Sequence, residues 1–347
     1  MAHYFRPLCQ LDPARPAGAL TLAGGWCWFD RVEVLRRDAP PELIAATDLP
    51  GDVRDRLTAP RPPLLELTLD RPRVMGILNV TPDSFSDGGS FFAREVALAH
   101  GRTMLSAGAE IIDVGGESTR PGAAVVRPDE ETSRIRAVVA ALARRAPISI
   151  DTRKAPVAAA AFAAGAGMLN DVSALRFDPD LAGVAATAGV PVCLMHAQGQ
   201  PATMQDDPRY DDVLLDVYDF LAARIAAAEA AGIPHDRLVL DVGIGFGKTV
   251  AHNLALLRRM ALFHGLGCPL LLGASRKRFI GTIGRADPAA ARMPGSLAVA
   301  LAGVAQGVQV HRVHDVAPMV QALRLWRAVT GAPEPSRAPT HEPSEEP

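Results

Sequence analysis

The sequence predicts an α/β protein whose core is a (β/α)8 barrel. From residue 73 to about residue 330, eight short apolar runs alternate with eight segments of helical periodicity. The runs are continuously apolar, as expected of parallel strands that are covered by helices. About 250 residues is also the usual size of this barrel. A doubly wound open sheet is the alternative, but it would need fewer strands or a longer crossover.

Each apolar run ends at a polar or glycine-rich turn. We expect strands at 74–78, 110–114, 148–150, 167–169, 190–195, 238–242, 270–273 and 308–313. The segments between them are rich in Ala, Leu and Arg. They predict helices at 93–107, 129–145, 155–164, 180–187, 211–231, 251–263, 296–305 and 315–329.

Two further regions lie outside the repeat. Residues 1–60 form an N-terminal extension of unknown role, in which the apolar cluster Trp26 to Phe29 predicts a strand or hairpin. Residues 61–72 are expected to be a Pro-rich linker to the barrel at 73–330. The tail, 331–347, is rich in Pro, Glu and Ser and is expected to be disordered.

The composition excludes several classes of protein. With 48% hydrophobic and 21% charged residues, the chain can bury a sizeable core. A formal charge of −2 gives no reason to expect a nucleic-acid or membrane partner. The four cysteines are too widely spaced for a zinc site or a disulfide framework, and the start lacks a signal-peptide core. We expect a cytoplasmic protein that binds small molecules.

Lysine is rare in this chain. Lys154, Lys248 and Lys277 are the three lysines among 36 Lys and Arg residues. A coding bias explains the preference for arginine, but a lysine that persists against it suggests a position that needs a compact ammonium group. The segment before Lys248 resembles a phosphate-binding P-loop, but its glycine spacing is one residue short.

The ends of the predicted strands are unusually polar. In a (β/α)8 barrel, the active site lies at the C-terminal ends of the strands. A single aspartate there is often only a helix N-cap, but here every strand ends in polar residues or in a loop rich in them. These residues are Asn79, Asp113, Asp151, Asn170, His196, Asp241, Lys277, Arg312 and His314.

Position divides this set into an outer and a deeper group. The loops after the last two strands commonly bind phosphate in this fold, and Arg312 and His314 lie there. Asn79, on the neighbouring strand, could hold Mg²⁺ or a phosphate oxygen, and Thr119 with Arg120 could fold over the same anion. The outer group therefore predicts an anionic leaving group such as diphosphate.

The deeper group suits a different partner. Asp151, Asn170 and Asp241 offer carboxylate and amide groups to the N–H donors of a flat heterocycle. Lys277 offers an ammonium group to a carbonyl or ring nitrogen on the opposite edge.

Two long motifs are more specific than any single residue. They are Met75-Gly-Ile-Leu-Asn-Val-Thr-Pro-Asp-Ser-Phe-Ser-Asp-Gly-Gly and Ile111-Ile-Asp-Val-Gly-Gly-Glu-Ser-Thr-Arg-Pro-Gly. Both resemble signatures of the dihydropteroate synthases, and the resemblance continues from residue 73 to residue 329. It implies condensation of a 6-hydroxymethyl-7,8-dihydropterin diphosphate with p-aminobenzoate in folate synthesis. It also implies a homodimer.

The resemblance implies a role for each site residue. The implied catalytic residues are Asp151, Lys277 and Arg312, and the implied pterin site comprises Asp151, Asn170, Met195, Asp241, Phe246, Lys277 and Arg312. Diphosphate would be bound by Asn79, Thr119, Arg120, Arg312 and His314, with Mg²⁺ at Asn79. p-Aminobenzoate would be bound by Phe85, Thr119, Pro121, Lys277 and Arg278. The implied mechanism is dissociative: diphosphate leaves, Asp151 stabilises the methylene cation, and the arylamine attacks.

Two positions depart from the family pattern. Val242 stands where the family more often has proline, and Arg278 stands where some members have a small hydroxyl residue that meets the p-aminobenzoate carboxylate. Two other functions remain as alternatives. A methyltetrahydrofolate–corrinoid methyltransferase shares the deep carboxylates but has no need of the anion-binding loops. A non-catalytic pterin-binding relative is the second alternative, and the intact polar strand ends argue against it.

Overall fold

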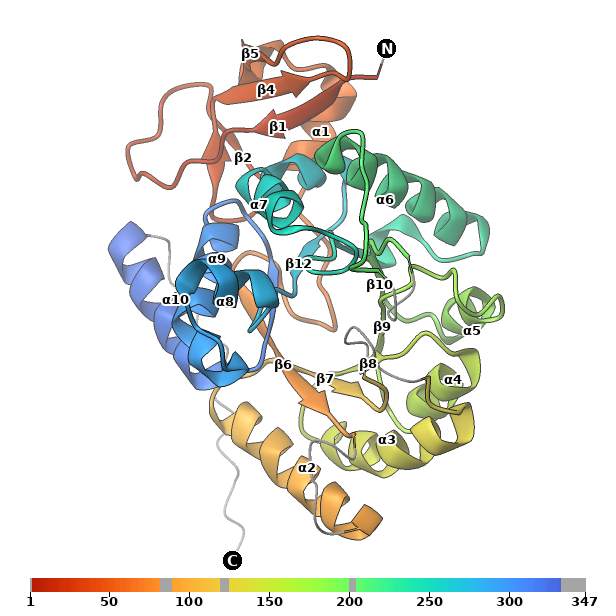
Figure 1. Cartoon of the computed structure of the whole chain (residues 1–347). Helices are drawn as coiled ribbons and strands as arrows, with labels where there is room; N and C mark the ends of the chain where they lie inside the picture. Colours follow the sequence, from red (N-terminus) through yellow and green to blue (C-terminus); the bar gives the residue numbers. More distant parts are fainter. Residues whose placement is uncertain (1, 82–88, 119–124, 200–203, 332–347) are drawn as a thin grey trace, which may run out of the picture.

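Eight parallel strands close into a barrel that helices surround, which confirms the predicted fold class (Figure 1). The computed structural model describes residues 2–81, 89–118, 125–199 and 204–331. The barrel order is β10-β11-β12-β13-β6-β7-β8-β9, so the first and last strands of the repeat are neighbours. Among the described residues, no helix has the length and apolar character needed to span a membrane.

All eight predicted strands are present. They are β6 (Arg73–Asn79), β7 (Ile111–Gly115), β8 (Ile148–Asp151), β9 (Met168–Asp171), β10 (Val192–Met195), β11 (Leu238–Asp241), β12 (Leu270–Leu272) and β13 (Val310–Val313). The predicted helices are present as α2 (Gly89–Ser106), α3 (Pro128–Leu142), α4 (Ala155–Ala163), α5 (Leu181–Ala188), α6 (Val213–Ala230), α7 (Val250–Arg258), α9 (Met293–Val304) and α10 (Val316–Thr330).

Two helical segments differ from the prediction. The helix expected at 251–263 ends as α7 at Arg258, and a 3-10 helix, η4 (Met260–Leu266), follows it. Arg259 breaks the α-helix because its backbone, at φ −131° and ψ 30°, is not helical. A short additional helix, α8 (Arg278–Gly284), follows β12. Its two glycines weaken the helical signal, so the sequence did not reveal it.

The barrel interior has an apolar layer below a polar one. Inward-facing residues of seven strands form one buried cluster: Met75, Ile111, Met168, Cys193, Val239, Leu271 and Val310. Alternate residues of a strand face the same side. The residue two positions after Ile111, Met168, Val239 and Val310 therefore also faces inward, and these residues are Asp113, Asn170, Asp241 and Arg312. The polar layer thus lies at the C-terminal ends of the strands.

The segment expected as a linker closes the base of the barrel. Leu64 and Leu69 are buried in the same cluster as Met75, and Leu64 pairs with Leu67 in a short antiparallel bridge. The bottom apolar layer would otherwise be exposed to water, so covering it is favourable. Residues 61–72 therefore pack directly on the barrel.

The N-terminal extension is a small folded unit. The strands β1 (Tyr4–Pro7), β4 (Arg31–Leu35) and β5 (Glu42–Ala45) form an antiparallel sheet. The hairpin expected near Trp26 is present as β2 (Leu20–Thr21) and β3 (Trp28–Phe29). Helix α1 (Gly51–Thr58) completes the unit, which lies against α6, α7 and α9 in Figure 1.

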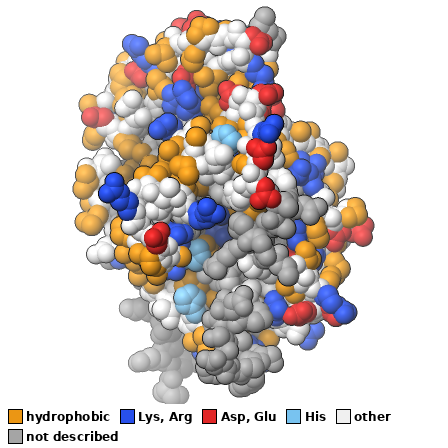
Figure 2. Space-filling view, in the orientation of Figure 1, with side chains coloured by type: hydrophobic (Ala, Val, Ile, Leu, Met, Phe, Trp, Pro, Cys, Tyr) orange, Lys and Arg blue, Asp and Glu red, His pale blue; other side chains and the backbone are white. Residues whose placement is uncertain are grey.

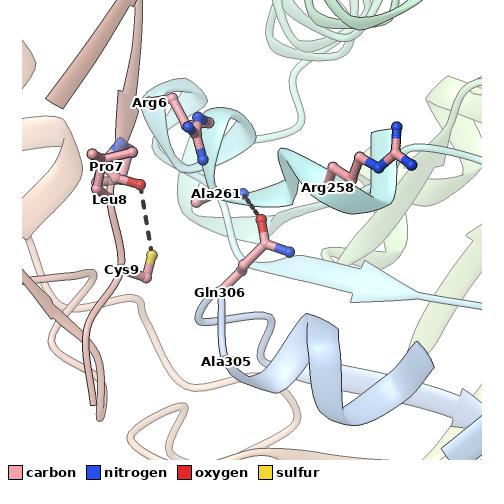
Figure 3. Close-up of a pocket in the computed structure, with 8 residues that line it drawn as sticks. All are labelled: Arg6, Pro7, Leu8, Cys9, Arg258, Ala261, Ala305 and Gln306. Carbon is pink, nitrogen blue, oxygen red and sulfur yellow. Dashed lines mark hydrogen bonds between the residues drawn. The ribbon is translucent and has the colours of Figure 1, made fainter. Parts of the chain in front are cut away.

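This unit docks at the base of the barrel. The Trp26 indole N–H donates to the Val304 carbonyl at 2.8 Å, and the rings of Tyr4 and Tyr218 meet edge to face at 5.2 Å. A cavity of about 200 Å³ lies in the junction, lined by Arg6, Pro7, Leu8, Cys9, Arg258, Ala261, Ala305 and Gln306 (Figure 3). On the barrel side, the junction is formed by η4 and by the end of α9, which precede β12 and β13 in the chain. The unit therefore lies near the N-terminal ends of these strands, whereas the polar layer lies at the C-terminal ends.

Removing residues 1–60 is expected to destabilise the chain while leaving catalysis measurable. The deletion would expose the barrel surface beneath Trp26, and each kcal/mol lost lowers Tm by about 2 to 4 °C in a large domain. The truncated and full-length chains would be compared by thermal unfolding and turnover, with Trp26→Phe as a control that removes the indole N–H but keeps an aromatic ring in the junction. A truncated chain that is folded and soluble but inactive would show that the extension contributes to the site.

Candidate active site

An arginine between two aspartates forms the floor of the site. The Arg312 Nε donates to Asp113 Oδ2 at 2.6 Å, and its Nη2 donates to Asp151 Oδ2 at 2.7 Å. The Asn170 amide also donates to Asp113 Oδ2, at 3.0 Å. Four strands, β7, β8, β9 and β13, therefore contribute to one connected set of side chains.

Asp113 is a site residue that the sequence did not assign. It was noted only as a polar strand end, yet it is fully buried and links Arg312 to Asn170. The available signal was its position: it follows Ile111 by two residues, as Asn170 follows Met168, on the same face of a strand.

Within the part of the chain that the structure describes, two oxygens on this floor have no hydrogen-bond partner. Asp113 Oδ1 and Asp151 Oδ1 are buried and unpaired, as is the Ser149 hydroxyl one layer below Asp151. Leaving a buried acceptor unpaired costs about 1 to 3 kcal/mol. These atoms are therefore suited to accept hydrogen bonds from the N–H groups of a bound ligand.

Burial raises the pKa of Asp151 to about 7. The Arg312 guanidinium opposes this shift, whereas the charge of Asp113 adds to it. Burial also raises the pKa of the Asp241 carboxyl, although the Gly243 amide donates to Asp241 Oδ1 at 2.7 Å. Asp151 and Asp241 therefore bind protons more strongly than free carboxylates do.

Phe246 and Lys277 form one wall. The Lys277 ammonium lies 4.0 Å from the centre of the Phe246 ring, within the range of a cation–π contact. Lys277 comes from the loop after β12, and Phe246 comes from the loop after β11. Met195, at the end of β10, pairs in register with Asp241 on β11. The structure thus places Met195 beside Asp241, and Lys277 beside Phe246, at the ends of adjoining strands.

His314 of the outer group lies on the loop after β13, whereas Arg312 lies on β13 itself and belongs to the floor. The His314 ring nitrogen Nδ1 is 3.1 Å from the Ser275 hydroxyl, and Asp315 accepts two hydrogen bonds from Arg276, at 2.9 and 2.5 Å. These contacts tie the loop after β12 to the loop after β13. Figure 2 shows Lys, Arg and His side chains close together near the middle of this face, as suits an anionic ligand.

Asn79 borders the floor. A side chain on Gly115 would lie 3.6 Å from Asn79 Oδ1 and 3.5 Å from Asp151 Cβ, so the two residues flank Gly115. The other predicted residues of the outer group and of the p-aminobenzoate site on these loops lie outside the described residues. They are Phe85, Thr119, Arg120 and Pro121.

Both departures from the family pattern are accommodated. Val242 is buried in the main core and leaves the Asp241 carboxylate on the floor. Arg278 is exposed at the start of α8, directly after Lys277. It can therefore reach a ligand only from the rim of the site.

Comparison with known proteins places the chain in a family. Residues 75–314 match the model of the pterin-binding enzymes. The dihydropteroate synthase of Escherichia coli strain K12 is 49% identical over 273 residues, which are 78% of this chain and 96% of the relative.

Solved structures agree. A Xanthomonas albilineans dihydropteroate synthase with 4-aminobenzoic acid superposes with a TM-score of 0.73 at 49% identity, covering 77% of this chain and 96% of that chain. A structure of the enzyme from the same organism in complex with 7,8-dihydropteroate gives a TM-score of 0.70 at 46% identity, with 77% and 97% covered. The chain belongs to the dihydropteroate synthase family of pterin-binding enzymes.

Proposed function

We propose that this protein condenses (7,8-dihydropterin-6-yl)methyl diphosphate with p-aminobenzoate, yielding 7,8-dihydropteroate and diphosphate. The observation that carries the proposal is the buried floor of Asp113, Asp151 and Arg312, with its two unpaired carboxylate oxygens. Such a floor suits the N–H edge of a pterin ring. The Lys277 ammonium, on the opposing wall, suits a ring carbonyl or nitrogen.

The same floor serves the chemical step. The bond between the pterin methylene and the diphosphate oxygen breaks, and both bonding electrons leave with diphosphate. The ionised Asp151 carboxylate stabilises the positive charge that develops on the pterin. The p-aminobenzoate nitrogen then forms the new bond to the methylene and releases a proton. No covalent intermediate with the protein is required.

The outer group would bind the leaving diphosphate. Arg312 lies on β13, His314 directly follows that strand, and Asn79 lies on the adjacent β6. Asn79 offers an amide oxygen of the kind that Mg²⁺ accepts, since this ion takes few protein ligands and completes its shell with phosphate oxygens and water. Bound there, Mg²⁺ would neutralise negative charge on the leaving group.

We also propose that two copies of the chain associate through their barrel helices. Leu325 and Val329 lie one turn apart on α10 and are 62% and 84% exposed. Apolar side chains at this spacing form a stripe on one helix face, and such a stripe favours contact with another protein surface. Sedimentation as a monomer at micromolar concentration would contradict this.

A product assay tests the reaction. The purified protein would be supplied with the pterin diphosphate, p-aminobenzoate and Mg²⁺, and both diphosphate and 7,8-dihydropteroate would be measured. Equal amounts of the two products are expected, with neither formed when p-aminobenzoate is omitted. Methyl transfer from methyltetrahydrofolate to a corrinoid would favour the methyltransferase alternative, and pterin binding without turnover would favour the non-catalytic one.

Pterin affinity is expected to rise as the pH increases from about 5.5 to 7. The pKa of Asp151 is about 7 in the free site, and N–H donors of the ligand favour the ionised carboxylate. Binding below pH 7 therefore releases a proton, and affinity changes by at most about tenfold per pH unit. Calorimetry in two buffers of different ionisation enthalpy would measure the released proton.

The ligand for this experiment is 6-hydroxymethylpterin. It lacks the diphosphate, whose own ionisation near pH 6 would obscure the signal. Asp151→Asn is the control, because its amide has no proton to release in this range. Equal proton release from the wild type and Asp151→Asn would show that another group is responsible.

A further inference from the structure

We propose that Lys248 is a positioning residue for the pterin site, holding Phe246 and, through it, the ammonium of Lys277. This proposal rests on the proposed function for the identity of the ligand. Lys248 is one of the three lysines, is 3% exposed, and is absent from the floor and the outer group described above.

The Lys248 ammonium joins two loops of the barrel. Its Nζ lies 2.8 Å from His196 Nδ1 and 3.3 Å from the His196 carbonyl oxygen, both in the loop after β10. It also lies 3.0 Å from the Gly243 carbonyl and 3.1 Å from the Phe246 carbonyl, in the loop after β11. Four acceptors thus surround a group that has three protons to donate when it is charged, and burial lowers the pKa of Lys248 to about 7.

His196 is suited to accept a hydrogen bond from Lys248. Burial, with the Lys248 charge as a second cause, lowers the pKa of His196 to about 2. The imidazole is therefore neutral, and its Nδ1 can accept a hydrogen bond from the Lys248 ammonium. Arginine cannot take the place of Lys248, because a planar guanidinium cannot direct its donors to acceptors that converge on one nitrogen.

The loop after β11 needs this ammonium because it is wound tightly. Gly243, Gly245 and Gly247 have φ values of +67°, +81° and +61°, a region that favours glycine. A side chain on Gly243 would overlap the His196 carbonyl, so the two loops are in close contact. The carbonyls of His196, Gly243 and Phe246 converge there, and the lysine ammonium compensates their negative ends.

The loop transmits this constraint to the pterin wall. Lys248 binds the Phe246 carbonyl, and the Phe246 ring lies against the Lys277 ammonium. The Cβ position of Gly245 is 3.2 Å from Lys277 Cδ, so the loop also contacts the stem of that lysine. Loss of the Lys248 ammonium should therefore weaken pterin binding, although Lys248 does not itself belong to the wall that faces the ligand.

The first test measures binding of 6-hydroxymethylpterin to the full chain. Lys248→Met is expected to weaken binding roughly tenfold, within the usual range of coupling between contacting residues. Lys154→Arg is the matched control for Lys248→Arg: it enlarges another buried lysine but keeps a cation against Glu117 and Glu131, so it should leave pterin binding within about twofold. Lys248→Arg should not restore binding. An unchanged affinity in Lys248→Met would overturn the proposal.

A double-mutant cycle tests the route through Phe246. If Lys248 acts through this ring, Lys248→Met should have little further effect in a Phe246→Leu background. Independent, multiplicative losses would show that the lysine acts elsewhere. In steady-state assays, the loss should appear in the KM for the pterin diphosphate more than in the KM for p-aminobenzoate.

A spectroscopic measurement separates this proposal from the proposed function. Lysine labelled with ¹³C at the ε-carbon gives one signal for each of the three lysines. The Lys277 signal should be shifted upfield by the Phe246 ring in the wild type, and the shift should be lost in Lys248→Met. A wild-type spectrum without that shift would overturn the proposal even if the variant failed to fold. Failure to form dihydropteroate, with the shift present, would instead contradict the proposed function alone.

Discussion

Replacing Arg312 with methionine is expected to lower the free energy of unfolding by about 3 to 5 kcal/mol at pH 8. The largely buried guanidinium lies between the carboxylates of Asp113 and Asp151, with contacts of 2.6 and 2.7 Å. Methionine fills similar space but removes the cation that allows both buried carboxylates to be ionised. The variant should also lose turnover, because the carboxylate that stabilises the pterin cation would be held protonated.

The loss of unfolding free energy in Arg312→Met should be smaller at pH 5.5 than at pH 8. The pKa of Asp151 is raised in the folded chain, so between the unfolded pKa near 3.8 and the folded pKa near 7 the folded state holds more protons. The stabilisation that Asp151 provides by binding this proton is thus fully present below pH 3.8, and it is lost as the pH rises through about 7. Without Arg312, the pKa of Asp151 in the folded chain rises above 7. The free energy of unfolding of the variant therefore continues to fall as the pH rises above 7.

Urea unfolding at the two pH values would measure both effects. Arg37→Met is the control, since Arg37 also pairs with two aspartates, Asp216 and Asp219, but at the surface. Exposed pairs contribute about 0 to 1 kcal/mol, and the control should show little dependence on pH in this range. Equal losses of unfolding free energy in Arg312→Met and Arg37→Met would show that the buried ion pairs of the floor stabilise the chain no more than surface pairs do.

The sequence was sufficient to predict the barrel and much of its floor. Each strand appears as a continuous apolar run because helices cover it, and the position of the active site follows from the fold. Asp151, Asn170 and Asp241 could be predicted as neighbours because they end strands that lie next to or near one another. The rarity of lysine drew attention to Lys154, Lys248 and Lys277, and the first two of these are buried.

Contacts between distant segments could not be predicted in this way. The bridging role of Asp113 depends on which atoms of Arg312 reach it across the barrel. The contact of Lys248 with His196 depends on the close approach of two loops, 52 positions apart in the chain. Leu64 and Leu69 looked like part of a linker because only the closed barrel provides the apolar surface that they cover. These features arise from tertiary packing, which has no periodic signal.

Replacing Lys277 with alanine is expected to weaken pterin binding roughly 100-fold with little loss of stability. A hydrogen bond to a charged group contributes about 1.5 to 3 kcal/mol, and tenfold in affinity corresponds to about 1.4 kcal/mol. Lys277 is half-buried, so water screens the attraction between its charge and the Asp241 carboxylate, and the free energy of unfolding should change by less than about 1 kcal/mol. Calorimetry with 6-hydroxymethylpterin and urea unfolding would measure the two quantities.

Two neighbouring variants make the Lys277 experiment specific. Lys277→Arg keeps the charge but should still bind pterin poorly, because a planar fork of donors cannot replace a compact ammonium that is directed at one atom of the pterin ring. Arg278→Ala changes the next residue, which is exposed on α8. It should leave pterin affinity within about twofold, as expected for an exposed side chain, while raising the KM for p-aminobenzoate. Normal pterin affinity in Lys277→Ala would remove Lys277 from the pterin site, and a loss in Arg278→Ala as large as that in Lys277→Ala would assign the effect to α8 as a whole.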